Sequence, residues 1–207
     1  MVVARRYTFS DLLDLPDDHI YDIVGGALLV WNAPDGNHAE LHTELFGFLF
    51  AAQTAGYGFV YSGTRAVALD FPLRGADAQD VTHPDLFFIR EGREGILGAR
   101  AVEGAPDLVI EILSHTTRHE HAPGGTLRDA YERNGVPHYW LADARTRTIR
   151  QYELIGEPYV GGRYGEPVTL RTGDLITSSL FPGLSVPLAQ VFRRVRDHPH
   201  PARDRRL

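Results

Sequence analysis

The feature that most constrains the fold of this chain is its pattern of short apolar runs. Turns that contain glycine, proline or polar residues separate these runs. Runs of this length are typical of strands, because helices need longer stretches with a wider period. We expect strands over residues 57–61, 65–71, 84–89, 107–113, 136–142 and 148–154, and a tight hairpin over residues 21–31 around Gly25 and Gly26. After Gly156 the chain is rich in glycine, and there we expect irregular structure.

Three segments have helical patterns instead. Residues 8–15 begin with Thr8 as a cap and end before Pro16. Residues 38–54 place five apolar side chains on one helical face, namely Leu41, Leu45, Phe48, Leu49 and Ala52. Residues 125–134 form a short helix that stops at Gly135. The sum is an α/β or α+β domain with a central mixed sheet, in which strands outnumber helices.

Composition limits the partners and the compartment. All 21 basic residues are arginine, and the net charge of -6 argues against a protein that coats nucleic acid by bulk electrostatics. A cleft lined by a few arginines is still compatible with that charge. The absence of cysteine excludes disulfides and thiolate chemistry. No apolar run approaches the roughly 20 residues that cross a bilayer, so we expect a soluble, cytoplasmic protein.

At 207 residues the chain is most simply one domain. We expect that domain to cover residues 1–192. Residues 193–207 carry six arginines together with prolines and polar residues, which predicts a basic and flexible tail.

Three acids occupy strand positions where an apolar residue is expected, namely Asp22, Asp85 and Glu111. Burying an isolated carboxylate costs several kcal/mol, so such groups are usually paired, hydrogen-bonded or bound to a metal. Two acids at adjacent strand ends suit Mg²⁺, which takes oxygen ligands. Taken singly, each acid fits a structural role at a solvated strand edge better than a catalytic one.

Six segments carry a resemblance to a known family. They are TFSDLLDLPDDHIYDIVGGALLV, PDGNHAELHTEL, HPDLFFI, GAPDLVIEILSHTT, LRDAYERNGVPHYWLADARTRTIRQYEL and FPGLSVPLAQVF. In this order they resemble the Uma-two family of restriction-endonuclease-like proteins, in the PD-(D/E)XK nuclease superfamily. The resemblance implies a restriction-endonuclease-like core, a mixed sheet flanked by helices with extra hairpins. It also implies a homodimer that hydrolyses DNA phosphodiester bonds with Mg²⁺, or with Mn²⁺ in its place.

The resemblance also implies roles for single residues. Asp85 matches the aspartate of the family's PD motif, and Glu111 matches the acid of its (D/E)xK motif. In such sites these two acids and the backbone carbonyl of Ile112 hold the metal. Asp22 falls where the family usually has glutamate and would be an auxiliary acid. His38 matches the histidine that opens the first long helix.

The family's usual lysine is missing. It lies four residues before the tyrosine that corresponds to Tyr131, and that position holds Leu127. Arg128 or Arg118 could supply positive charge, because arginine binds phosphate well. Arginine stays protonated, so it could stabilise a transition state but not act as a base. The alternative is a degenerate family member that keeps the fold and acts as a binding or assembly protein.

The loop after Glu111 contains His115, His119 and His121. With Glu111, the pair His115 and His119 could bind Zn²⁺ or Mn²⁺ if the loop were helical. A histidine here could also act as a general base near neutral pH. The simpler alternative is a solvated loop, since exposed histidine-rich loops are common.

Overall fold

The computed structural model describes residues 5–16, 19–31, 36–114 and 117–196. Its main sheet contains β3 (Gly58–Ser62), β6 (Leu86–Arg90), β8 (Leu108–Ile112), β9 (His138–Asp143), β10 (Thr148–Glu157), β11 (Gly161–Tyr164) and β12 (Val168–Leu170). The strand order is β11-β10-β9-β8-β6-β3, and β12 pairs with β10. Strands β8 and β9 are parallel, whereas the remaining pairs are antiparallel. The predicted mixed sheet is therefore confirmed.

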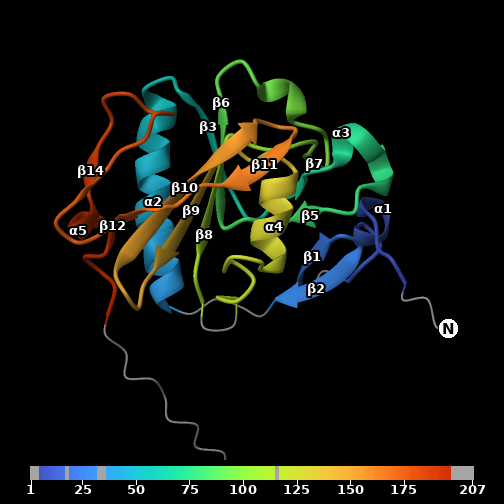
Figure 1. Cartoon of the computed structure of the whole chain (residues 1–207), viewed down its shortest axis with the longest axis horizontal. Helices are drawn as coiled ribbons and strands as arrows, with labels where there is room; N and C mark the ends of the chain where they lie inside the picture. The colour runs from blue at the N-terminus through green and yellow to red at the C-terminus, as the bar shows by residue number, and fades with distance from the viewer. Residues whose placement is uncertain (1–4, 17–18, 32–35, 115–116, 197–207) are drawn as a thin grey trace, which may run out of the picture.

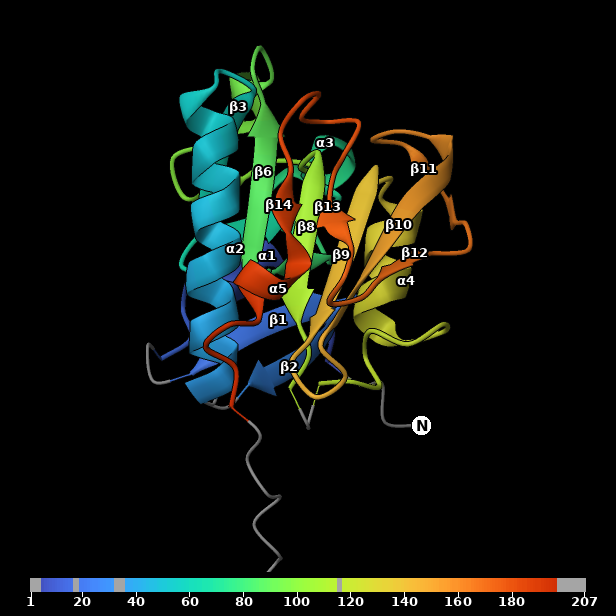
Figure 2. The same ribbon diagram turned by 90° about the vertical axis from the view of Figure 1, so that its left-hand side faces the viewer.

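Two helices cover opposite faces of this sheet (Figures 1 and 2). Helix α2 (Gly36–Thr54) buries the five apolar residues predicted for it against one face. Helix α4 (Thr126–Arg133) covers the other face. Side chains alternate along a strand, so Ile110 and Ile112 of β8 pack in the core cluster with α2, and Val109 packs in the cluster with α4. This alternation places Glu111 on the α4 face.

A second sheet lies beside α4, on its right in Figure 1, and has the order β2-β1-β5-β4-β7. Its strands are β1 (Ile20–Val24), β2 (Ala27–Trp31), β4 (Ala66–Ala68), β5 (Val81–Thr82) and β7 (Ala101–Val102). Gly25 and Gly26 connect β1 to β2 with φ of 56° and 79°, as a tight hairpin requires. Helix α1 (Phe9–Leu12) precedes this sheet, and its capping box joins Thr8 and Asp11.

The strand predicted over residues 65–71 is wrong in its second half. Strand β4 ends at Ala68, and α3 (Phe71–Arg74) follows, continued by the 3₁₀ helix η1 (Gly75–Asp77). Pro72 lies in the first turn of α3, where its missing N–H costs no helical hydrogen bond. The Asp70 carboxylate accepts the backbone N–H groups of Gln79 and Asp80, which holds the chain in this bend.

The irregular structure predicted after Gly156 is also wrong. Strand β10 continues to Glu157 and pairs with β11, and a small sheet of β13 (Leu175–Ile176) and β14 (Val186–Pro187) precedes helix α5 (Leu188–Val191). A Cβ atom on Gly156 would lie 2.6 Å from the carbonyl oxygen of Gly161. These glycines therefore permit a close strand pair. A short 3₁₀ helix, η2 (Glu94–Ile96), completes the elements of the described ranges.

The first residues of the predicted tail lie against α2. Val195 is buried in the same core cluster as that helix, and Arg193 pairs with Glu44. The backbone N–H of Arg196 donates to Asn37. Residues 197–207 fall outside the described ranges, so the division at residue 192 stays a prediction. Every helix in the described part of the chain falls short of the length and hydropathy that a bilayer crossing requires.

Candidate active site

The pairing of β6 with β8 brings two of the predicted acids together. Leu86 lies opposite Ile110 and Phe87 lies opposite Val109, so the next pair in this antiparallel register is Asp85 with Glu111. The backbone N–H of Asp85 donates to Glu111 Oε2 at 3.4 Å, and the backbone N–H of Ile112 donates to Asp85 Oδ2 at 2.7 Å. The acids that sequence reasoning placed at neighbouring strand ends are therefore adjacent.

The two carboxylates differ in exposure. Glu111 is 6% exposed, whereas the Asp85 side chain is 23% exposed. Burial raises the pKa of Glu111 well above its ordinary value, and the negative charge of Asp85 raises it further. The Tyr131 hydroxyl donates to Glu111 Oε1 at 2.6 Å and opposes part of that rise. The two adjacent carboxylates repel each other, and a bound cation would offset that repulsion. Their oxygens, at a partly open position, are the donors that a hard divalent cation prefers.

Asp22 belongs to the same electrostatic cluster, because its charge also raises the pKa of Glu111. It lies on β1 and is 3% exposed. Its Oδ2 accepts from the Trp31 indole at 2.7 Å, and its Oδ1 accepts from the His83 backbone N–H at 2.8 Å, with the His83 Nδ1 atom at 3.2 Å. The protein itself therefore fixes the orientation of the third acid.

Two histidines of α2 contact Asp85. His38 Nε2 lies 2.9 Å from Asp85 Oδ1, so both carboxylate oxygens of Asp85 have protein partners. His42, one turn later, forms a hydrogen bond with the backbone of Asp85. Burial lowers the pKa of His42, and the charge of Asp85 opposes that change. The N-terminal half of α2 therefore holds the strand end that carries Asp85.

The arginines proposed as substitutes for lysine have other partners. Arg128 lies over the rings of Tyr152 and Tyr164, with its guanidinium carbon 4.8 and 5.9 Å from their centroids, and it pairs with Glu132. Leu127 is 3% exposed and packs in the apolar cluster with α4.

Arg118 forms a bidentate pair with Asp143, at 2.5 and 2.9 Å. Within the described residues, neither Arg118 nor Arg128 forms an ion pair with Asp85 or Glu111.

The histidine-rich loop is not uniformly solvated. His119 is exposed and pairs with Glu120. His121 is 3% exposed, its Nδ1 lies 2.7 Å from the Tyr139 hydroxyl, and burial lowers its pKa to about 4. His115 lies outside the described residues, so the predicted His115 and His119 metal site stays untested. In the described ranges, no group of three or more His, Cys, Asp or Glu residues is arranged to hold a metal ion.

Sequence reasoning did not assign roles to Trp31, His83 and Tyr131, whose side chains contact the acids. Tyr131 served only to locate the lysine position. One signal could have identified His83, which lies two residues before Asp85 and therefore on the same side of an extended chain. Trp31 reaches Asp22 only because the hairpin folds β2 back on β1.

Comparison with known proteins identifies the family and the fold of the chain. The Uma2 family, described as "Putative restriction endonuclease", matches residues 8–189. A crystal structure from Anabaena variabilis, described as a "putative nuclease belonging to DUF820", has 17% identity to the chain and a TM-score of 0.66, and the match covers 90% of this chain and 98% of that one. At this identity the likeness establishes the fold, which is restriction-endonuclease-like. No curated protein sequence matches the chain. Because the family match spans most of the sequence, the chain belongs to the Uma2 family.

Proposed function

We propose that this protein hydrolyses DNA phosphodiester bonds with a divalent cation, Mg²⁺ or Mn²⁺, held by Asp85 and Glu111. The observation that carries the proposal is the adjacency of these two carboxylates across β6 and β8. The family description supports the same class of reaction. By the resemblance of the motif, the carbonyl of Ile112 would be a third ligand.

Other residues of the chain hold these groups in place. The Tyr131 hydroxyl fixes one oxygen of Glu111, and the Ile112 N–H and His38 fix Asp85. A bound cation would polarise a phosphoryl oxygen and lower the pKa of a water molecule. Both oxygens of Asp22 accept hydrogen bonds that hold its orientation, and its charge acts on Glu111 of the pair.

We do not assign the stabilising positive charge to Arg128. Its guanidinium is held by Glu132 and by the rings of Tyr152 and Tyr164. The predicted homodimer is a separate expectation, which light scattering of the purified chain would test.

The test is cleavage of supercoiled plasmid and of labelled oligonucleotides with Mg²⁺, with Mn²⁺ and with EDTA. Glu111→Gln and Asp85→Asn keep the shape of each side chain and remove its charge. We expect each to lower the rate at least about 100-fold, because even residues that only support a metal ligand contribute about 10- to 100-fold.

Glu153→Gln is the matched control, because Glu153 lies on β10 with its side chain 73% exposed. It should cleave like the wild type. Cleavage that persists in Glu111→Gln would contradict the assignment of Glu111 as a metal ligand. A wild-type chain that binds DNA but cleaves with neither cation would instead be the degenerate binding protein.

A further inference from the structure

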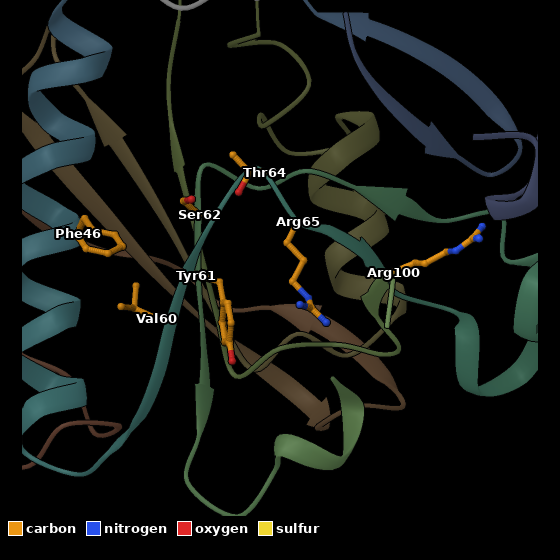
Figure 3. Close-up of a pocket in the computed structure, with 7 residues that line it drawn as sticks. All are labelled: Phe46, Val60, Tyr61, Ser62, Thr64, Arg65 and Arg100. Atoms are coloured by element: carbon orange, nitrogen blue, oxygen red, sulfur yellow. The ribbon is translucent and has the colours of Figure 1, made fainter. Parts of the chain in front are cut away.

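A pocket of about 490 Å³ lies around β3, at the edge of the main sheet (Figure 3). Its polar lining comes from Tyr61, Ser62, Thr64, Arg65 and Arg100. Phe46 of α2 borders the end away from Arg100. The described lining includes two arginines and no acidic residue, so the pocket is positively charged although the chain as a whole has a net charge of -6.

The pocket adjoins the candidate active site. Ser62 lies opposite Leu86 in the pairing of β3 with β6. The next residue, Gly63, donates its backbone N–H to the carbonyl oxygen of Asp85 at 3.1 Å. A Cβ atom at Gly63 would lie 2.9 Å from the Pro84 carbonyl oxygen. Glycine, which lacks a Cβ atom, therefore lets this turn pack against the segment that carries Asp85. A ligand in the pocket therefore lies beside the strand end that carries Asp85.

Arg65 holds the segment that carries Arg100. Its guanidinium donates to the carbonyl oxygens of Gly98 and Ala101, which flank Arg100 closely in sequence. The Arg65 Nε is buried and lacks a hydrogen-bond partner among the described residues, so this guanidinium has donor capacity that the fold does not use. Arg100 itself is exposed. The chain thus provides one fixed and one accessible positive charge.

Aromatic side chains line the pocket on both sides of β3 (Figure 3). Tyr61 stacks on Phe87 with centroids 5.2 Å apart, and the guanidinium carbon of Arg65 lies 6.0 Å from the Tyr61 centroid. Phe46 stacks on His42, the residue that bonds the Asp85 backbone. Positive charge beside aromatic rings is the combination that binds single-stranded nucleic acid, by phosphate contacts and by base stacking.

We propose that this pocket binds a phosphate and the adjoining nucleoside of a single DNA strand that leads to the acid pair. The inference rests on the proposed function, because it takes DNA as the substrate. The volume is that of a small-ligand pocket, which suits one unpaired nucleotide. Arg100 binds the phosphate, and Tyr61 lies beside the base.

The test measures binding rather than cleavage. A fluorescently labelled single-stranded oligonucleotide is titrated in EDTA, and anisotropy gives the affinity at several salt concentrations. Arg100→Ala should weaken binding about 10-fold and make the slope of log K against log salt shallower by about 0.7, the value for one phosphate contact on a single strand. Arg100→Lys should keep the slope, because it retains the charge.

Arg163→Ala is the matched control. Arg163 is also an exposed arginine, and it lies on β11 at the opposite edge of the same sheet. It should leave affinity and slope unchanged. The inference is overturned if Arg100→Ala behaves like Arg163→Ala, or if the wild type does not bind a single strand at low salt. It is also overturned if Arg100→Ala weakens the binding of duplex DNA but not of single-stranded DNA.

The two proposals fail separately. A loss of binding in Arg100→Ala, with no cleavage by the wild type under either cation, would keep the pocket and remove the nuclease. Normal cleavage with unchanged binding in Arg100→Ala would keep the nuclease and remove the pocket.

Discussion

At the scale of single residues, the candidate site consists of acids whose partners are uncharged donors and imidazoles. Glu111 meets the Tyr131 hydroxyl, Asp85 meets His38, and Asp22 meets the Trp31 indole. Burial and the neighbouring carboxylate both raise the pKa of Glu111. A positive charge near this pair would therefore stabilise the ionised form of Glu111.

Leu127→Lys should supply that charge. Leu127 lies one helical turn before Tyr131 on the buried face of α4, and Tyr131 reaches Glu111. We expect the cleavage rate to rise about 10- to 100-fold, because one well-placed donor or charge contributes on that order. The measurement is the rate of plasmid nicking at saturating Mg²⁺.

Leu127→Met is the control, because methionine is unbranched like lysine but apolar, and it is close to leucine in size. If Leu127→Lys folds but cleaves no faster than Leu127→Met, the position does not supply the missing group.

At the scale of elements, the end of α4 depends on one glycine. Gly135 has φ of 72°, and a Cβ atom there would lie 2.5 Å from the backbone nitrogen of Val160 and 2.6 Å from that of Tyr159. The carbonyl of Gly135 also accepts the N–H of Tyr159. The helix that carries Tyr131 is thus joined to the turn between β10 and β11.

Gly135→Ala should destabilise the protein by more than its backbone strain alone. Gly92 has φ of 82° and no atom within 4 Å of an added Cβ, so Gly92→Ala isolates the cost of a positive φ, about 1–2 kcal/mol. Gly135→Ala adds a backbone clash that no side-chain rotation relieves. Urea unfolding gives both free energies, and equal losses in the two variants would contradict this account.

At the scale of the whole molecule, buried neutral histidine links stability to pH. Burial lowers the pKa of His121 to about 4, although the charges of Asp85, Asp22 and Glu120 raise it in part. In the unfolded chain the pKa is about 6.5, so the unfolded state takes up a proton first as the pH falls. His121 therefore contributes stability that is fully present above about pH 6.5 and is lost between about pH 6.5 and 4.

The full loss from His121 is on the order of 3 kcal/mol. Urea unfolding at pH 7.5, 6 and 5 measures the part of this loss that occurs above pH 5. His121→Phe should lose less stability than the wild type over this range, since one titrating group is gone. His42 and His138 also have lowered pKa values and remain in both proteins, so some pH dependence persists. Identical slopes in wild type and variant would rule out His121 as a source.

The sequence by itself determined the elements whose patterns are local. The helical period of residues 38–54 gave the buried face of α2, and Gly135 marked the end of α4. The runs around Asp85 and Glu111 predicted β6 and β8. These predictions succeeded because the periods of helices and strands are properties of neighbouring residues.

Only the tertiary structure decided what meets those acids. Tyr131 comes from α4, His38 from α2 and Trp31 from β2, and no local pattern specifies such contacts between distant segments. The same holds after Gly156, where glycines that suggested a loop instead let β10 and β11 pair closely. A side-chain pattern shows which face of an element is buried. Its partner is set by sheet register and helix packing, which depend on the whole chain.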